Sequence, residues 1–339
     1  MKAIKLTLLF TVLCVVAGIL GCSQKNFNEV VVYTTVDQLF SEPILKDFEK
    51  QTGIKIRAVF DTEETKSTGV LNRLIAEKNN PQCDVFWSGD PVRPIILKNK
   101  KITFPYNSPM ASDIGVHFKD KQFHWIGFSA RARVLIYNTN LIRPEDAPQS
   151  ILDLVNEKYK GQVAIANPLF GTTSFHFAAI FLSLGNENAK QFFAELKRNN
   201  VVIATSNGDV KKRVTQGEAW CGLTDTDDAF VAMNDGAPLS IVFFDQNGLG
   251  TLIMPNTVSL IRDSPNNENG KRLIDYLLSR ETEEKLAISC AQMPLHKGVN
   301  TPPNISSLDN ISPMKIDYEK TAQKLEEIQF YLKEWGESH

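Results

Sequence analysis

Cysteine is scarce in this sequence, and neither sign of charge dominates it. Two of the five cysteines, Cys14 and Cys22, lie close to the N-terminus. The others, Cys83, Cys221 and Cys290, are odd in number and their spacing fits no zinc motif. We expect buried free thiols, with one disulfide as the alternative. The formal net charge is −2 and no basic patch occurs, which argues against a nucleic-acid partner.

Long apolar runs and catalytic motifs are also missing. Beyond the N-terminal segment, no apolar run is long enough to span a bilayer. The histidines are scattered without the helical spacing of metal ligands, and the stretch Gly127–Arg131 lacks the second glycine of a nucleophile elbow. We therefore expect no enzyme and no cofactor, unless a metal ion is bound as part of a ligand.

The N-terminus has the form of an export signal. Lys2 and Lys5 precede the uncharged run Leu6–Leu20, which is short for a membrane span. The run ends in Gly21 and Cys22, a pattern that resembles the lipobox of bacterial lipoproteins. The resemblance implies cleavage before Cys22, lipidation of this residue and a polar tether after it. An ordinary signal peptide cut nearby and an uncleaved anchor are the alternatives, and each of these places the protein outside the cytoplasm.

Patterns of strands and helices alternate along the remainder, which predicts an α/β protein with right-handed βαβ units and a largely parallel sheet. After processing, about 315 residues are enough for two domains. The strands are expected at 29–33, 54–60, 84–87, 125–138, 163–166, 201–204, 240–244 and 251–261, and the main helices near 43–52, 71–75, 174–184, 188–198, 267–279, 281–289 and 318–335.

An acidic turn follows one of the predicted strands. Ala219–Leu223 has strand character, and Asp225, Asp227 and Asp228 come directly after it, before a helical pattern. Ligands of open α/β sheets collect at such strand ends, and three carboxylates this close need water, donors or a cation between them. The alternative is a solvated turn with one aspartate as a helix cap. The turn is no EF-hand loop, because Phe230 stands where a glycine is required.

A second candidate site precedes the helix predicted at 174–184. Gly171, Thr172, Thr173 and Ser174 combine a glycine with hydroxyl groups between a strand and this helix. The first-turn amides of a helix are unpaired and the dipole favours negative charge, so a phosphate, phosphonate or carboxylate would bind there. Helix capping by Thr173 or Ser174 is the alternative.

Several segments together resemble one known family. The segments "VVVYTT", "KDFEKQTGIKI", "CDVFWSGD", "GFSARARVLIYNT", "YKGQVAIANPLFGTTSF", "QGEAWCGLTDTDD" and "PNTVSLIRDSPN" occur in the order seen in type II periplasmic solute-binding proteins. The chain is most similar to the ferric-ion-binding branch of these ABC importer receptors. The resemblance implies a two-lobed periplasmic binding protein-like fold with two crossing strands, near Gly127–Val134 and Phe244–Pro255. The ligand would bind in the cleft between the lobes, which close by hinge motion.

The same resemblance suggests a domain plan and a set of binding residues. The plan is a signal peptide at 1–21, a lipid-anchored tether at 22–28, a first lobe at 29–126, a second lobe at 127–250, and a return to the first lobe at 251–339 with C-terminal helices packing across both lobes. Arg131 would donate to the bound anion or form a salt bridge between the lobes. Besides the two candidate sites above, the ligand-binding residues would be Thr34, Thr35, Asp37, Ser88, Gly89, Asp90, Ser129 and Arg131.

The sequence departs from the ferric-binding pattern at the iron ligands. Many of these relatives have a histidine after the first strand, a glutamate after the third and a tyrosine pair in the second lobe. This chain has Asp37 or a neighbour at the first position, Gly89 beside Asp90 at the second, and Asp227-Asp228 in place of the tyrosines. Carboxylates suit hard cations and also protonated amines. A metal site at Asp227 and Asp228 is therefore one hypothesis among others.

These observations lead to one main functional hypothesis and two alternatives. The main hypothesis is an exported, lipid-anchored, monomeric receptor that faces the periplasm or the cell surface and delivers its ligand to an ABC permease. The ligand would be a small anion or zwitterion, similar to an aminophosphonate, or a metal–anion pair. The alternatives are a ferric-ion receptor with carboxylate ligands and a receptor that presents its ligand to a membrane sensor.

The lipid anchor can be tested at one residue. Cys22→Ser should abolish labelling by radioactive palmitate and release the protein from the membrane fraction, because Cys22 alone among the cysteines follows a small residue at the end of the apolar run. Unchanged lipid labelling of this variant would refute the predicted anchor.

Overall fold

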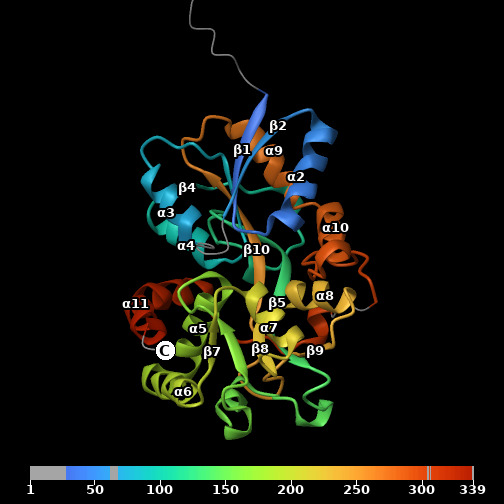
Figure 1. Ribbon diagram of the computed structural model, residues 1–339. Helices are drawn as coiled ribbons and strands as arrows, with labels where there is room; N and C mark the ends of the chain where they lie inside the picture. Colours follow the sequence, from blue (N-terminus) through green and yellow to red (C-terminus); the bar gives the residue numbers. More distant parts are fainter. Residues whose placement is uncertain (1–27, 62–67, 304, 306, 338–339) are drawn as a thin grey trace, which may run out of the picture.

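The computed structural model describes residues 28–61, 68–303, 305 and 307–337, which form two α/β lobes joined by long strands (Figure 1). The predicted signal peptide and Cys22 lie outside the described residues. Within the part that is described, no helix has the length and apolar character that crossing a bilayer requires.

The first lobe is built around three parallel strands. Its helix α2 buries Phe40, Ile44 and Phe48 against the sheet and ends at Gly53, whose φ of 68° allows its amide to bond Glu49 O. The elements of this lobe are β1 (Glu29–Thr34), α2 (Gln38–Thr52), β2 (Lys55–Phe60), α3 (Thr68–Ala76), β3 (Val85–Ser88), α4 (Val92–Asn99), β4 (Thr103–Phe104), α9 (Asn267–Leu277) and α10 (Arg280–Cys290).

The second lobe repeats this arrangement around β6, β7 and β8. Its elements are β6 (Val163–Ala166), α5 (Gly171–Leu184), α6 (Asn186–Arg198), β7 (Val202–Ala204), α7 (Asn207–Gln216), β8 (Cys221–Asp225), α8 (Thr226–Asn234) and β9 (Leu239–Val242). Short 3-10 helices occupy Pro109–Ala111, Val116–Phe118, Pro144–Asp146, Ile151–Val155, Glu157–Tyr159 and Leu308–Asn310.

Two long strands, β5 (Ile126–Asn138) and β10 (Ile253–Ile261), connect the lobes (Figure 1). The strand order is β2-β1-β3-β10-β5-β8-β6-β7, with β4 beside β10 and β9 beside β5. Pairing is parallel within each lobe, and β5 and β10 pair antiparallel with each other and with their neighbours. The sheet is therefore mixed rather than largely parallel, because the connecting strands run against both lobes.

The second connecting strand begins later than the sequence suggests. Phe244 belongs to a turn in which the amides of Gly248 and Gly250 bond Asp245 O, and Asp245 has a φ of 59°. This turn, and not a strand from Phe244, precedes β10. The strand itself starts at Ile253.

The crossing of β5 and β10 is irregular at one point. The register shifts between Pro255 and Asn256, and Ser129 on the opposite strand has a φ of 42°. Two side chains bind its peptide groups: Ser129 N donates to Glu283 Oε1 at 2.7 Å, and Asn256 Nδ2 donates to Ser129 O at 2.8 Å. Ser129 therefore has a role in the connection between the lobes.

The C-terminal helix α11 (Tyr318–Glu337) contacts both lobes. It packs on α4 of the first lobe and α5 of the second. Glu319 accepts from Lys98 Nζ at 3.0 Å, and Trp335 Nε1 donates to Phe193 O at 2.8 Å. The helix is thus a further link between the two halves of the molecule.

The three cysteines of the described chain are free and buried, which confirms the expectation of free thiols. Cys83 lies in the first lobe, Cys221 starts β8 and Cys290 ends α10. Burial raises the pKa of Cys221 to about 12 and holds the pKa values of Cys83 and Cys290 above their usual range. All three thiols are therefore protonated at neutral pH.

A glycine in β8 sets the packing of the second lobe. A Cβ on Gly222 would lie 2.6 Å from Val210 Cγ1 and 2.7 Å from Ala164 O. Gly222→Ala should destabilise the protein by about 1–3 kcal/mol, as overpacking of a dense core does. Urea unfolding measures the change.

Gly208→Ala is the matched control for this prediction. Its Cβ would meet only Ser206 Oγ, at 3.5 Å, and alanine favours the helix α7 by up to about 1 kcal/mol. Equal stability of wild type and Gly222→Ala would show that α7 packs less closely on β8 than described.

Candidate ligand-binding site

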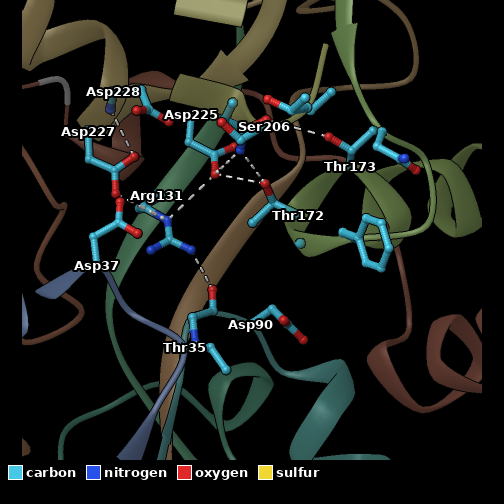
Figure 2. A pocket seen from close by; sticks show the side chains of 17 residues that line it. Thr35, Asp37, Asp90, Arg131, Thr172, Thr173, Ser206, Asp225, Asp227 and Asp228 are labelled. Atoms are coloured by element: carbon cyan, nitrogen blue, oxygen red, sulfur yellow. Dashed lines mark hydrogen bonds and ion pairs between the residues drawn. The ribbon is translucent and has the colours of Figure 1, made fainter. Parts of the chain in front are cut away.

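A cavity lies between the lobes at the ends of several strands (Figure 2). The volume in which the centre of a water molecule can lie is about 40 Å³. One bound water needs about 10–15 Å³ on the same measure. A ligand of only a few atoms therefore fits this conformation. Such a position beyond the carboxyl ends of strands is where open α/β sheets bind ligands. The lining residues are Thr35, Asp37, Gly89, Asp90, Arg131, Ala166, Asn167, Phe170, Gly171, Thr172, Thr173, Thr205, Ser206, Asn207, Asp225, Asp227 and Asp228.

Three helices of the second lobe, α5, α7 and α8, begin at this cavity. Gly171 starts α5 with a φ of 54°, and Phe170 before it supplies no side-chain cap. First-turn amides have no acceptors inside their own helix, and the dipole makes this end positive. The start of α5 therefore suits an anionic group.

A buried arginine organises the side chains around this helix start. Arg133 on β5 is fully buried, and its NH1 donates to Asp225 Oδ1 at 2.9 Å and to Asn207 Oδ1 at 2.8 Å. Its NH2 donates to Thr173 Oγ1 at 2.8 Å. Asp225 Oδ2 in turn accepts from Thr172 Oγ1 at 2.8 Å and from Asn207 Nδ2 at 3.2 Å. The hydrogen bonds of Asp225 are thus provided by the protein itself.

Arg131 reaches across the cleft from β5. Its NH2 donates to Gly89 O at 2.6 Å, while its Nε lies 3.5 Å from Asp227 Oδ2 and 4.0 Å from Asp225 Oδ2. Burial opposes the charge of Arg131, but Asp227, Asp225 and Asp37 together hold its pKa above the ordinary value. Arg131 thus bonds the first lobe through Gly89 O and the second through Asp227, and its contact with a bound anion stays a prediction.

The pKa of the Asp227 carboxyl group is raised by its surroundings. Burial raises its pKa to about 7, and the negative charges of Asp228, Asp225 and Asp37 add to this rise while Arg131 opposes it. Asp228 lies at the edge of the cluster, where Oδ1 is 3.4 Å from Lys211 Nζ and Oδ2 accepts from Thr224 Oγ1 at 3.2 Å.

The first lobe contributes the opposite wall. Thr35 Oγ1 accepts from Gly89 N at 2.8 Å, which fixes the turn after β3. Asp90 Oδ1 accepts from the first-turn amides of α4, Val92 N at 2.8 Å and Arg93 N at 3.1 Å. Asp90 is therefore engaged as a helix cap, although it also lines the cavity.

Four residues of the predicted set do not line the cavity. Thr34 Oγ1 accepts from Val36 N, and Ser88 Oγ accepts from Asp90 N. Ser129 lies at the crossing of the strands. Ser174 Oγ points the other way, where it donates to Gly171 O at 2.8 Å and accepts from Arg93 NH2 at 2.9 Å. The remaining predicted residues line the cavity, and their contact with a ligand stays a prediction.

Sequence reasoning missed the wall contributed by α7, together with Arg133. Thr205, Ser206 and Asn207 line the cavity because a helix starts there, and Ser206 Oγ caps it by accepting from Asp209 N at 3.1 Å. The signal was a serine followed three residues later by an acid, ahead of Val210 and Val214. Ala166, Asn167 and Phe170 also line the cavity.

Among the described residues, no group of three or more His, Cys, Asp or Glu side chains is placed to hold a metal ion. No tyrosine is found among the described residues of the cavity wall. Asp227 and Asp228, the predicted metal ligands, lie beside Arg131 and Lys211, and metal binding by them stays a prediction.

The raised pKa of Asp227 has a consequence for stability. Between about pH 4 and pH 7 the folded protein holds a proton on Asp227 that the unfolded chain has released, so the free energy of unfolding should fall as pH rises through this window. In Asp227→Asn, the part of this pH dependence that comes from residue 227 should be absent. Urea unfolding of both proteins at pH 5 and pH 8 measures the difference, and the other titrating groups are common to both. If the free energies of unfolding of wild type and Asp227→Asn differ by the same amount at pH 5 and pH 8, the prediction is wrong.

Comparison with known proteins agrees with this geometry. Residues 44–312 match the family described as bacterial extracellular solute-binding protein. The chain is 27% identical over 297 residues to a periplasmic protein of Salmonella typhi named as 2-aminoethylphosphonate-binding, covering 86% of this chain and 80% of that protein. It is 22% identical over 298 residues to the Fe(3+)-binding periplasmic protein of Serratia marcescens, covering 85% of each.

A solved structure shows the same fold. Iron-bound HitA from Pseudomonas aeruginosa matches with a TM-score of 0.82 at 20% identity, covering 90% of this chain and 99% of that chain. This likeness confirms the predicted type II fold of two lobes with a cleft between them. With the family match over most of its length, the chain belongs to the bacterial extracellular solute-binding proteins.

Proposed function

We propose that this protein is a lipid-anchored receptor of an ABC importer and binds a small zwitterion, a short phosphonate with an amino group. The observation that carries the proposal is the cavity itself, which places an uncapped helix start beside a cluster of aspartates. The name of the Salmonella typhi relative, 2-aminoethylphosphonate-binding, supports the same chemistry.

The charges around the cavity suit such a ligand. The lining carboxylates are Asp37, Asp90, Asp225, Asp227 and Asp228. The neighbouring cations are Arg131, Arg133, Arg93 and Lys211. With all groups charged, five negative and four positive charges leave one negative charge in excess. An anion alone would add to this excess, whereas a zwitterion brings a cation with its phosphonate.

The start of α5 supplies donors for the phosphonate. Backbone amides at a helix N-terminus are preorganised for tetrahedral oxyanions. Thr173 Oγ1 accepts from Arg133 NH2 at 2.8 Å and donates to Asn207 Oδ1 only over 3.5 Å, so its hydroxyl hydrogen can turn to a closer acceptor. Thr172 donates to Asp225 and is therefore engaged. The hydroxyl of Thr173 is the side-chain donor that we assign to the anion.

We infer binding without covalent chemistry. The described residues that line the cavity include no histidine, cysteine or lysine that could form a nucleophile–base pair with a hydroxyl group. A monomer anchored through Cys22 and delivering its ligand to a permease is the arrangement that we propose. Presentation of the closed form to a membrane sensor remains the alternative, which a transport assay in a permease deletion strain tests.

Thermal shifts with a set of ligands test the function. Ligands that bind the folded state raise Tm, so 2-aminoethylphosphonate should raise it more than ethylphosphonate, inorganic phosphate, β-alanine or ferric citrate. Thr173→Val should weaken binding of 2-aminoethylphosphonate by about 1–3 kcal/mol, because it removes one donor at nearly constant size.

The exposed Thr139→Val, which does not line the cavity, is the control and should bind as wild type does. Absence of any shift with the phosphonates would refute the proposal. A visible charge-transfer band on addition of ferric citrate would show instead that a tyrosine binds iron.

A further inference from the structure

We propose that a proton on His296 holds the hinge between the lobes, so that the lobes open more easily as pH rises. The imidazolium acts through Glu283, whose carboxylate binds the backbone of Ser129 where β5 and β10 cross. This inference concerns the connection between the lobes, and it does not depend on which ligand the cleft binds.

The crossing of β5 and β10 has the features of a hinge. Hinge motion is absorbed by a few residues whose backbone angles change. Ser129 has a φ of 42°, which a residue other than glycine seldom adopts, and the register of the two strands shifts beside it. Its neighbour Ala130 exchanges two backbone hydrogen bonds of 2.7 Å with Met293, which follows α10. The segment after α10 therefore binds β5 at the hinge.

The carboxylate of Glu283 binds this hinge from α10. Glu283 is fully buried, and its Oε1 accepts from Ser129 N at 2.7 Å and from Leu295 N at 2.9 Å. Its Oε2 accepts from His296 N at 3.0 Å. Three backbone donors favour the ionised form of the carboxyl group, because each of them stabilises negative charge on its oxygens. A buried carboxylate also requires a positive partner.

His296 is this partner. Its Nδ1 lies 2.8 Å from Glu283 Oε2, and its Nε2 lies 2.9 Å from Met110 O and 3.3 Å from Asp113 Oδ1. Both ring nitrogens face acceptors, so an ionised Glu283 requires a hydrogen on each of them, which is the imidazolium form. Burial opposes the charge of His296, but the hydrogen bonds to Glu283 and Met110 raise its pKa. The charges of Glu283 and Asp113 add to this rise.

The charged groups around the ring belong to α10 and to the loop that leads to β5. The helix contributes Glu283 and Arg280, the loop contributes Asp113, and Lys297 follows His296 in the chain. Arg280 donates to Asp113 Oδ2 and to Lys297 O. Asp113 therefore has a cation beside it, whereas Glu283 forms its ion pair with His296.

Loss of the proton from His296 releases the hinge. The neutral ring presents a lone pair of Nδ1 to the carboxylate, and Glu283 is then buried without its counter-charge, which favours its separation from Ser129 N. Because the pKa of His296 is raised in the folded protein, the proton is fully present below the ordinary value of about 6.5 and is lost as pH rises through the raised value. The lobes should therefore open more readily on the alkaline side of this transition.

Amide hydrogen exchange measured by mass spectrometry tests the inference on the intact protein without any ligand. His296→Gln removes the titrating group, and the ratio of its exchange rate to that of wild type at the same pH cancels the intrinsic pH dependence of exchange. For peptides that contain Ser129 and Ala130, this ratio should be at least about tenfold at pH 6 and close to one at pH 9. A peptide from α6 should exchange alike in both proteins.

His117→Gln is the matched control, because it makes the same substitution at an exposed histidine that precedes β5. Its exchange ratio should be close to one at both pH values. Asp113→Asn is a second variant, which keeps Glu283 and His296 and removes a charge that raises the pKa of His296. The pH at which the Ser129 peptide loses protection should be lower in this variant than in wild type. This shift decides the question if His296→Gln does not fold.

The outcomes separate the hinge from the proposed function. A ratio for His296→Gln that is the same at pH 6 and pH 9 refutes the inference, because His296 then acts by packing alone, and an unchanged transition in Asp113→Asn refutes it as well. Ligand binding and lobe closure are linked, so the Kd ratio of His296→Gln to wild type for 2-aminoethylphosphonate should also fall toward one between pH 6 and pH 9. A Kd ratio independent of pH refutes the effect on lobe opening. If this probe does not bind, the proposed function fails while the exchange ratio still decides for or against the hinge.

Discussion

The ion pair between Arg133 and Asp225 is the interaction on which the cleft depends. Both side chains are buried, and a buried charge that loses its partner costs about 3–5 kcal/mol. The pair joins the connecting strand β5 to the end of β8, and Thr172 and Asn207 bind to it from the starts of α5 and α7. One guanidinium therefore positions two helix starts and one strand end around the same cavity.

Much of the fold follows from local signals. The helix α2 was predictable from its apolar spacing and Gly53, and β5 from its long extended pattern. The helix α4 was not predictable, because Pro91 and Pro94 indicate a loop. Proline is nevertheless compatible with the cap and the first turn of a helix. The mixed sheet could not be predicted either, since strand direction depends on how the connecting strands β5 and β10 run between lobes.

The binding site was only partly predictable, because contacts between separate elements leave no local signal in the sequence. The carboxylates of the acidic turn and the glycine at Gly171 are visible in sequence because they interrupt regular patterns. Arg133 lies two residues beyond Arg131 on the same strand, and no local signal tells that Arg133 pairs with Asp225 while Arg131 lies beside Asp227. Nor can sequence show that Asp225 is already bound by three donors, because these come from β5, α5 and α7.

The buried thiols have a consequence for the route by which such a chain matures. In an oxidising compartment, a thiolate is the species that reacts, and Cys83, Cys221 and Cys290 are thiolates only at alkaline pH once they are buried. Before folding, all three are accessible and have ordinary acidity. Their protection against oxidation is therefore acquired by folding, and a chain that folds slowly after export is exposed to wrong disulfides for longer. Packing of the first lobe and of β8 therefore shields these thiols as well as stabilising the fold.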